Sequence, residues 1–287
     1  MIYELKQKIR YSKWGDATAK WLEKTPVFPA CYWLLAAVGW TEPPRYVGAN
    51  KKGTLAYFRG NQDKINKITQ NLADEKSKKV FKKAISCRCS GYFRLKGTPE
   101  DQYFPKDIIH LSDEEVFVDC GAYTGDTIAK FREQTKDHYK KIVAFEPDPE
   151  NFKKLIQVKV PNCICFQEGV WNKKETLSFW AEGDMGSSLV MGNSKKVVVS
   201  VQALDGVDSC SDMTFLKMDI EGAELNALKG AEQTIRKQRP NLAICIYHSN
   251  QDMLEIPLWV MSLNLGYKLY VRHHDRGHLA DTILYAV

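Results

Sequence analysis

The sequence lacks any segment that would cross a membrane or direct secretion. Its most apolar window, residues 27–40, has 14 residues and contains Pro29, whereas a transmembrane helix needs about 20 consecutive apolar residues. The first residues, MIYELKQKIRYSKWGD, are charged and have no apolar core, so they do not form a secretory signal. No long low-complexity tract is visible either. We therefore expect a globular, cytoplasmic protein without a transmembrane segment.

Cysteine spacing typical of a zinc site is also missing. The chain has eight cysteines, and its two closest pairs, Cys87 with Cys89 and Cys163 with Cys165, follow a C-x-C rather than a C-x-x-C pattern. No histidine falls at metal spacing from these pairs. Without a secretory signal we expect reduced thiols, and we predict no metal site.

Positive charge is unevenly distributed along the chain. Residues 1–110 carry 21 Lys and Arg against 10 Asp and Glu, whereas residues 111–287 carry 20 against 25. The first region is predicted to be mainly helical and to end at a boundary near residues 98–112, where Gly97–Thr98–Pro99 interrupts the pattern. Its basic character favours an anionic partner or a role in substrate access, although solvated helix faces account for it equally well.

Apolar strands alternate with helices from residue 113 onward, which predicts an α/β domain over residues 111–287 with a mostly parallel sheet covered on both faces. Residues 177–207 are predicted to insert extra strands or a hairpin. No helix separates the last two strands, so these should pair antiparallel. Strands are expected over residues 116–119, 141–145, 163–167, 215–218, 242–247, 268–271 and 282–286, and helices over residues 126–133, 148–157, 223–237 and 256–265.

The segment VFVDCGAYTGDT places two glycines and two carboxylates directly after the first of these strands. Ligands of open parallel sheets bind at the carboxyl ends of the strands. Gly121 and Gly125 let the backbone pass close to a ligand. The third glycine of a dinucleotide-binding turn is absent, and Asp119 and Asp126 would repel a pyrophosphate. The turn favours a ligand that carries a cation and an amino group.

The next two strand ends continue this pattern. Glu146 ends the second strand, 27 residues after Asp119, where a carboxylate can accept both hydroxyls of a ribose. Glu168 and Gly169 follow the third strand, where an adenine edge would fall. Asp148 has the alternative explanation of a favourable charge in the first turn of a helix.

The segments VFVDCGAYTGDT, VAFEPDPENFKKL and FLKMDIEGAELNALKGAEQTI resemble the FkbM family of S-adenosylmethionine-dependent methyltransferases. The resemblance covers about residues 100–287, including DQYFPKDII and VRHHD…DTILYAV. It implies a seven-stranded, Rossmann-like methyltransferase sheet with its last strand antiparallel, and S-adenosyl-L-methionine as the cofactor. The resemblance implies contacts of the cofactor with Asp119, Gly121, Gly125, Asp126, Glu146, Glu168 and Gly169. We also predict cofactor contacts for residues next to these and at the end of the fourth strand: Tyr123, Thr124, Thr127, Pro147, Asp148 and Asp219.

Three residues on the acceptor side are candidates for catalysis. Asp219 ends the fourth strand of the domain and can face the methionine end, and Glu221 can face the acceptor, with helix capping as its alternative role. His248 ends the next strand, and its ordinary pKa of about 6.5 suits a base at neutral pH. We expect His248 to accept the proton of an acceptor hydroxyl, unless it is a surface loop histidine.

Two further segments are candidates for acceptor binding. Ser187 and Ser188 lie on a glycine-containing loop of the insertion, for which an ordinary turn is the competing interpretation. Arg272 and His273 follow the sixth strand and could bind an anionic sugar or phosphate, or simply lie in a solvated loop.

The preferred function is O-methylation of a hydroxyl on a sugar, glycan or small metabolite. A nucleic-acid partner is not expected, because the sequence has neither an N/D-P-P-Y/F motif nor a Pro–Cys pair for base methylation. RNA methylation stays open because of the basic first region, and a non-catalytic cofactor-binding module is the third alternative. The sequence leaves open which acceptor is used, the oligomeric state and any need for a metal.

Overall fold

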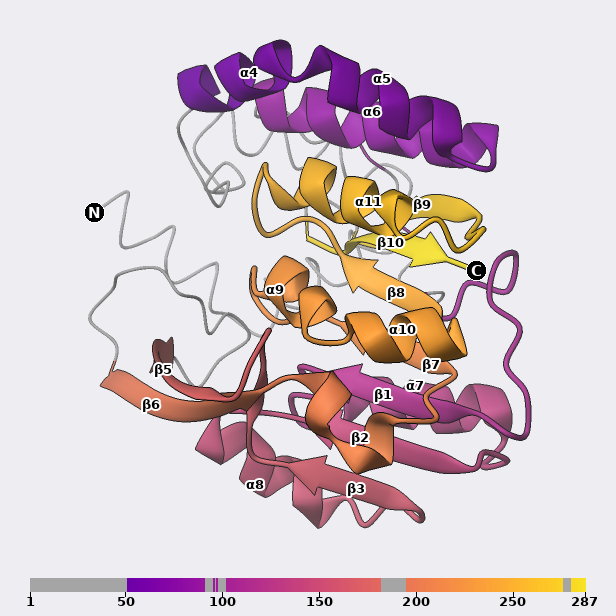
Figure 1. The fold of residues 1–287 in the computed structure, drawn as a ribbon, viewed down its shortest axis with the longest axis vertical. Coiled ribbons are helices and arrows are strands. Elements are labelled where there is room, and N and C mark those ends of the chain that lie inside the picture. Colours follow the sequence, from indigo (N-terminus) through magenta and orange to yellow (C-terminus); the bar gives the residue numbers. More distant parts are fainter. Residues whose placement is uncertain (1–50, 91–94, 96, 98–101, 182–194, 276–279) are drawn as a thin grey trace, which may run out of the picture.

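The computed structural model describes residues 51–90, 95, 97, 102–181, 195–275 and 280–287, and its centre is a seven-stranded sheet (Figure 1). The strand order is β3-β2-β1-β7-β8-β10-β9. Neighbours from β3 to β8 run parallel, and β10 runs antiparallel to both β8 and β9. The strands are β1 (Val116–Cys120), β2 (Lys141–Phe145), β3 (Cys163–Phe166), β7 (Phe215–Met218), β8 (Asn241–Cys245), β9 (Leu269–His273) and β10 (Thr282–Ala286). The predicted fold class is confirmed.

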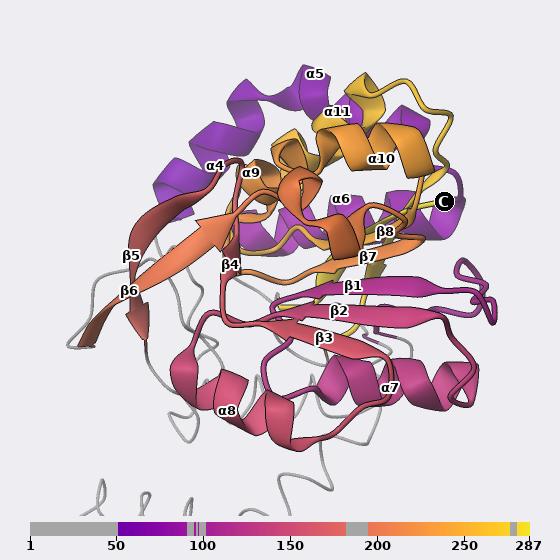
Figure 2. The ribbon, with the colours of Figure 1, turned by 60° about the horizontal axis from the view of Figure 1, so that its bottom comes forward.

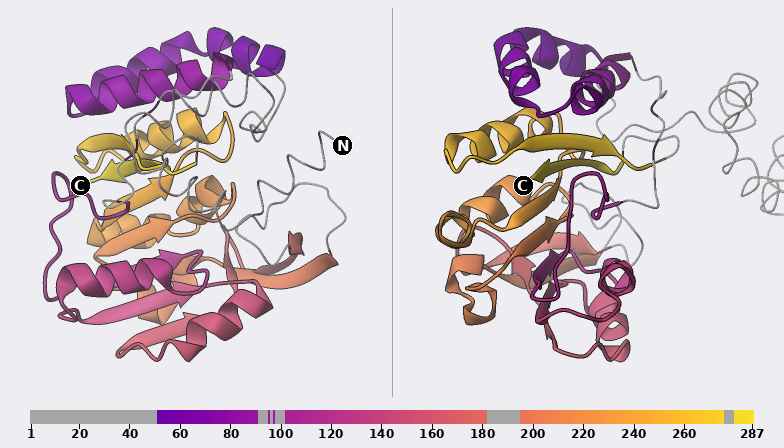
Figure 3. Two further views of the ribbon diagram at one scale, coloured as in Figure 1. Left: turned by 180° about the vertical axis from the view of Figure 1, so that it is seen from behind. Right: turned by 90° about the vertical axis from the view of Figure 1, so that its right-hand side faces the viewer.

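Helices cover both faces of this sheet (Figure 3). Alternate residues of each strand face opposite sides, so Phe117 enters one apolar cluster while its neighbours Val116 and Val118 enter the other. Phe117 stacks on Phe131 with ring centroids 4.5 Å apart. One face carries α7 (Asp126–Thr135) and α8 (Pro149–Gln157), and the other carries α9 (Glu224–Lys229), α10 (Glu232–Gln238) and α11 (Asp252–Ser262).

The helix predicted over residues 223–237 is in fact two helices, α9 and α10. The chain breaks at Gly230, where a Cβ atom would lie 2.1 Å from the carbonyl oxygen of Trp171. The backbone after β4 passes so close to this point that only glycine fits there. This contact is tertiary, which is why helical periodicity alone did not predict the break.

Three helices lie along the β9 edge of the sheet: α4 (Lys51–Gly60), α5 (Gln62–Asn71) and α6 (Glu75–Ser90). They belong to the same apolar cluster as the strands, since Phe58 and Phe81 are buried in it. Leu72 forms a parallel bridge with Leu269 of β9. The described part of the N-terminal region is therefore helical, as expected, and packed against the sheet. Its part in substrate access or partner contacts stays a prediction, and residues 1–50 lie outside the described residues.

The insertion forms a small second sheet of order β4-β6-β5, made of β4 (Gly169–Val170), β5 (Glu175–Ala181) and β6 (Lys195–Gln202). β5 and β6 pair antiparallel, as a hairpin requires. Figure 2 shows this sheet standing beside the ends of β1, β2 and β3. The 3-10 turns η2 (Leu204–Gly206) and η3 (Asp208–Cys210) lead back to β7.

Within the described residues, no helix combines the length and the apolarity that a membrane crossing needs.

Candidate functional site

The turn after β1 is built on two glycines in left-handed conformations. Gly121 has φ +79° and Gly125 has φ +90°. A Cβ atom on Gly121 would lie 1.9 Å from the carbonyl oxygen of Asp219, so a larger residue cannot stand there. The N–H groups of Gly121 and Ala122 both donate to the carbonyl of Phe145, at 3.0 Å. The turn is therefore fixed against the ends of β2 and β7.

A buried ion pair supports this turn from below. Lys217 Nζ lies 2.9 Å from Asp119 Oδ1, and both side chains are buried. The same Nζ donates to the carbonyl of Gly121 at 2.7 Å. Burial raises the pKa of Asp119 to about 6, against the opposing charge of Lys217. Asp119 therefore pairs with the lysine that contacts the turn, and its loop-orienting role stays a prediction. The sequence analysis missed Lys217, although a lysine inside an apolar strand is itself an unusual signal.

Glu146 stands at the end of β2 and is almost fully buried. Its Oε2 accepts from the N–H of Tyr123 at 2.8 Å, and its Oε1 accepts from the N–H of Asp148 at 2.9 Å. Burial raises the pKa of Glu146 to about 7, against these two hydrogen bonds. Each oxygen keeps a second lone pair that can accept from a ligand hydroxyl. Asp148 caps α8 and accepts from the N–H groups of Glu150 and Asn151 at 2.9 Å. These contacts are those of a residue at the start of a helix, which is the alternative role that the sequence offered for Asp148.

These strand ends surround one cavity of about 730 Å³. It lies within the size range of small-ligand sites. The sequence-predicted residues that line it are Gly121, Tyr123, Asp126, Thr127, Glu146, Pro147, Glu168, Gly169, Asp219 and Glu221. Asp119, Thr124, Gly125, Asp148 and His248 are not among the lining residues.

The remaining lining residues come from many parts of the chain, and the sequence analysis named none of them as site residues. They are Gln102 and Tyr103, Phe145 and Asn151, the apolar residues Val170, Trp171, Leu177, Val199, Val201, Ile220, Ala223 and Ala280, the buried Lys217, and the polar residues Tyr247, Asp275 and Asp281. The alternating apolar pattern of β6 and the DQYF segment were visible signals for some of them. Side-chain direction at the other positions depends on tertiary contacts.

The cavity suits a nucleoside that carries a positive charge. Its apolar wall can cover the face of a base, and Glu146 can accept from ribose hydroxyls. Asn151 Oδ1, in the cavity lining, is buried and has no hydrogen-bond partner among the described residues. The acidic side chains that line the cavity favour a cation over a pyrophosphate. Gln202 Nε2 donates to Glu168 and thereby holds that carboxylate beside the wall.

Asp219, at the end of β7, is the centre of a polar cluster. Its Oδ2 accepts from the hydroxyl of Tyr103 at 2.7 Å, and its Oδ1 accepts from the hydroxyl of Tyr247 at 3.1 Å. His248 Nε2 lies 3.3 Å from Oδ1. Burial alone would raise the pKa of Asp219, but the adjacent His248 ring and the charge of Lys217 hold it well below its usual range. Asp219 is therefore an ionised acceptor whose oxygens are occupied.

His248 stands between carboxylates. Its Nδ1 lies 3.1 Å from Glu224 Oε1, and its Nε2 lies 3.5 Å from Glu221 Oε2 as well as near Asp219. Burial lowers the pKa of His248, but the surrounding carboxylates outweigh burial and raise it well above the usual value. These surroundings favour the protonated imidazolium form of the ring, and the proton-accepting role expected from the sequence stays a prediction.

Glu224 lies in the first turn of α9, but its side chain is buried and accepts from the N–H of Ile220 at 2.8 Å. Glu224, Asp219 and His248 bring ligand-type atoms within 4.8 Å of one another. Because His248 presents a different nitrogen to each acid, we interpret these contacts as ion pairs around a protonated ring.

Glu221 is the most exposed acid of this cluster, with 37% of its side chain exposed against 22% for Asp219. It lines the cavity and has a left-handed backbone, with φ +55°. A non-glycine residue in this region is strained, a feature that often accompanies functional positions. Burial, followed by the charges of Asp219 and Glu224 against that of His248, raises the pKa of Glu221 to about 7.

Two of the predicted acceptor-binding residues, Arg272 and His273, do not line the cavity. Arg272 is buried, and its Nη2 lies 2.7 Å from Asp74 and 2.9 Å from Asp107. His273 is buried beside Thr282, with Nδ1 3.0 Å from Oγ1. Neither is among the residues that line the cavity, so the structure does not bring them to this site. Ser187 and Ser188 lie outside the described residues.

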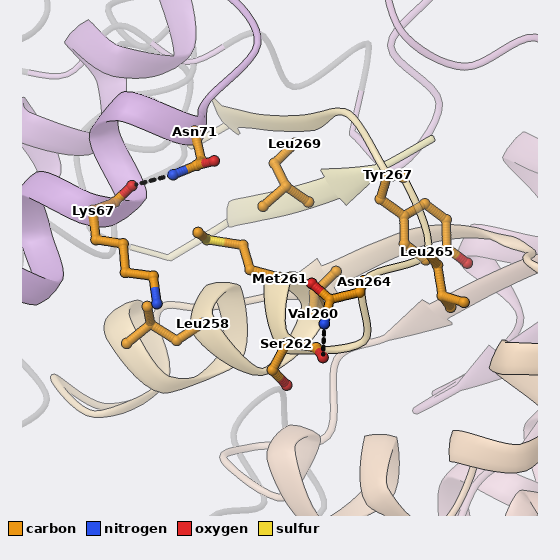
Figure 4. A pocket seen from close by; sticks show the side chains of 11 residues that line it. Lys67, Asn71, Leu258, Val260, Met261, Ser262, Asn264, Leu265, Tyr267 and Leu269 are labelled. Carbon is orange, nitrogen blue, oxygen red and sulfur yellow. Dashed lines mark hydrogen bonds between the residues drawn. The ribbon is translucent and has the colours of Figure 1, made fainter.

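A second hollow, of about 530 Å³, lies between α5 and α11 (Figure 4). Lys67 is the one charged side chain among its described lining residues. Its polar groups are largely local, such as the amide of Asn71, which donates to the carbonyl of Lys67 at 2.8 Å. It contains no cluster of titratable or nucleophilic groups among the described residues, unlike the larger cavity.

Comparison with known proteins agrees with this geometry. The model of the methyltransferase FkbM domain matches residues 119–269, just over half of the chain, from the β1 turn to β9. No curated protein matches the chain in sequence.

Among solved structures, the chain is similar to a methyltransferase FkbM from Methylobacillus flagellatus KT, with 27% identity and a TM-score of 0.70 over 81% of this chain. The match spans 60% of that protein's length. More distant matches are an rRNA methylase from Streptococcus thermophilus (14% identity, TM-score 0.38, 61% of this chain and 88% of that one) and a fibrillarin from Aeropyrum pernix in complex with S-adenosyl-L-methionine (14% identity, TM-score 0.39, 64% and 72%). The last two are too dissimilar to bear on function. The chain belongs to the FkbM family of methyltransferases.

Proposed function

We propose that this protein transfers a methyl group from S-adenosylmethionine to a hydroxyl of a glycan or small metabolite. The observation that carries the proposal is the order of groups around one cavity: the glycine turn after β1, Glu146 after β2, Glu168 after β3, and the cluster around Asp219 after β7. Membership of a methyltransferase family supports the same conclusion.

The cofactor-binding roles follow from the chemistry of these side chains. Glu146 accepts from the two ribose hydroxyls, and the apolar wall with Val170 and Val201 covers the adenine. The turn at Gly121 and the carboxylate of Asp126 lie toward the methionine part. S-Adenosylmethionine supplies a methyl group that is activated by its positively charged sulfur. The chain must then hold the acceptor oxygen in line, and correct positioning supplies much of the rate.

Removal of the acceptor's proton is assigned to Glu221. A general base works best when its pKa lies near the operating pH, and the pKa of about 7 at Glu221 satisfies this. His248, 3.5 Å away, balances the negative charge of the cluster, and Glu224 holds the ring from its other nitrogen. We assign His248 a positioning and charge-balancing role in place of the base role expected from the sequence.

Trp171 and Leu177 give the cavity an aromatic and apolar side that can pack on the ring of a sugar or metabolite. This agrees with the glycan or small-molecule acceptor expected from the sequence.

Calorimetry combined with a transfer assay tests the proposal. The protein should bind S-adenosylmethionine or its demethylated product more tightly than NADH. Glu146→Ala should weaken that binding at least about tenfold, since hydrogen bonds to a charged group contribute about 1.5–3 kcal/mol each. Glu150→Ala is the matched control, because it removes an exposed acid close to Glu146 in sequence, on α8. Methyl transfer from labelled cofactor is then followed on sugars, glycolipids, small alcohols and RNA. Tighter binding of NADH, or transfer to nitrogen alone, would refute the proposal.

A further inference from the structure

Acidic side chains far outnumber basic ones along the cavity. Lys217 is the one Lys or Arg among the described residues that line it. Seven lining residues carry carboxyl groups: Asp126, Glu146, Glu168, Asp219, Glu221, Asp275 and Asp281.

The charge of Lys217 is not available to a ligand. Its Nζ is buried, lies 2.9 Å from Asp119 and donates to the carbonyl of Gly121. The basic residues expected from the sequence at this rim are also engaged elsewhere, since Arg272 pairs with Asp74 and Asp107. Lys130 on α7 donates to Gln102 Oε1 at 3.4 Å, and its charge offsets that of Asp281 only in part.

Five of these acids are placed toward one end of the cavity or the other by the order of the strands that they flank. Glu146 and Glu168 belong to the end that suits the nucleoside. Asp219, Glu221 and Asp281 belong to the other end. Burial, and after it the charges of Asp219 and Asp275, raises the pKa of Asp281 to about 7, as expected for a carboxyl that faces like charges. His248 contributes one positive charge at this end, and S-adenosylmethionine would add one net charge. Among the described residues, the carboxyl groups at this end, which include Glu224 beside His248, still outnumber these two positive charges.

We propose, on the basis of the function proposed above, that the acceptor is a neutral or ammonium-bearing hydroxyl compound without a carboxylate or phosphate near the reacting oxygen. The carboxylates of Glu221 and Asp281 can accept hydrogen bonds from hydroxyl or ammonium donors. A carboxylate or phosphate at the same place would face like charges inside a partly desolvated cavity, which strongly disfavours the complex. A nucleic-acid acceptor is disfavoured for the same reason.

Matched acceptors test this proposal. Each scaffold, for example a hexose, supplies a neutral, an amino and an acid member, such as glucose, glucosamine and glucuronate. Cofactor binding is first measured by calorimetry without any acceptor, and its absence would count against the proposed function rather than against this inference. With the cofactor bound, methyl transfer to the amino and neutral members should exceed transfer to the acid members by about tenfold or more in kcat/KM. Equal transfer, preference for the acid members, or no transfer to any neutral or amino member overturns the inference.

Substitution of Asp281 provides the second arm. Asp281→Asn should raise the ratio of acid to amino acceptor in kcat/KM by about tenfold, because one like charge is removed. Asp208→Asn, which alters an exposed acid on η3 away from the cavity, is the matched control and should leave the ratio unchanged. The assays are repeated with Mg²⁺ and with a chelator. If acid acceptors are methylated well only with Mg²⁺ present, the carboxyls hold a metal ion and the inference is wrong.

Discussion

Lys217 and Asp119 face each other on neighbouring strands as a buried ion pair, with Nζ 2.9 Å from Oδ1. The lysine also donates to the carbonyl of Gly121. The side chain of Lys217 therefore connects β7, β1 and the glycine turn after β1. Removal of either charge would leave the other buried without its partner.

Lys217→Met should lower the free energy of unfolding by about 3–5 kcal/mol, because breaking a buried pair leaves an uncompensated charge. Urea unfolding measures this. Lys140→Met, which alters a lysine paired with Asp212 at the surface, should change stability by less than about 1 kcal/mol. The double variant Asp119→Asn with Lys217→Met should be less unstable than the sum of the two single changes. Additive effects would show that the two groups do not depend on each other.

Cofactor binding should strengthen as the pH rises through 7. Glu146 has its pKa raised to about 7 by burial, so it is partly protonated at neutral pH, and its ionised form is the better acceptor for ribose hydroxyls. The groups that face it are the N–H donors of Tyr123 and Asp148, the carboxylate of Asp148 and the charge of Lys217. Affinity should rise by up to about tenfold per pH unit below 7 and level off above it.

Glu146→Gln should remove this pH dependence, and calorimetry from pH 6 to pH 8.5 measures it. Glu150→Gln is the control, because that exposed acid lies outside the cavity. An unchanged slope in Glu146→Gln would mean that another group titrates.

Stability without ligand should show the opposite trend. A carboxyl whose pKa is raised on folding holds its proton in the native state at pH values where the unfolded chain has lost it, so stability falls as the pH rises from the unfolded pKa through the folded one. Asp119, Glu146, Glu221 and Asp281 all have raised pKa values, of about 6 or 7. Tm should therefore be lower at pH 8 than at pH 5.5, and Glu221→Gln should reduce the difference. A flat or rising Tm over this interval would contradict the shifts.

The sequence predicted most of the strands because each is a short apolar run that ends in polar or glycine residues. β2, β7 and β10 have the predicted bounds. Glu146 and the glycine turn could be placed for the same reason, since topology brings the ends of parallel strands together. These features depend on local pattern and on the order of the strands.

The partners of individual side chains could not be predicted in this way. Arg272 lies close in sequence to Asp275, which lines the cavity, but it pairs with Asp74 and Asp107, which are 198 and 165 residues away. Glu224 lies in the first turn of a helix, where acids are common, and only the fold brings His248 beside it. Such pairings depend on tertiary packing, and they decide whether a charged residue serves stability or the site.

Arg272→Met should therefore act on stability and leave the chemistry almost unchanged. Its guanidinium joins β9 to the acids before α6 and in the segment after Tyr103, and it is buried. Its removal should lower the free energy of unfolding by about 3 kcal/mol, at the low end for a broken buried pair because both acids are partly exposed. Arg236→Met, which removes an exposed pair with Glu232, should have little effect. A variant that keeps its stability but binds the acceptor more weakly would instead show that Arg272 belongs to the acceptor-binding site.

Glu221→Gln should lower kcat by about a hundred- to ten-thousand-fold, the usual contribution of a positioned general base. Its carboxyl lines the cavity and its pKa is about 7, whereas Asp219 is already occupied by two tyrosine hydroxyls. Cofactor affinity should stay within a few-fold of the wild type, since the ribose is bound by Glu146. In the wild type the rate should rise with pH to a plateau above 7, and this limb should be missing in the variant. A variant that keeps more than about a third of the wild-type kcat would show that positioning dominates.

His248→Ala separates a charge-balancing histidine from a proton-accepting one. If His248 accepted the proton, its removal would abolish the pH-dependent limb of the rate. In the arrangement described here the ring is an imidazolium between Asp219, Glu221 and Glu224. Its positive charge lowers the pKa of Glu221, against burial and the neighbouring acids. Removing it should therefore shift the limb to higher pH while the limb itself persists. The profile of kcat from pH 6 to pH 9.5, measured on one identified acceptor, distinguishes the two results. His248→Lys keeps a positive charge and should restore the wild-type midpoint more closely than His248→Ala, and loss of the limb in both variants would return the role of base to His248.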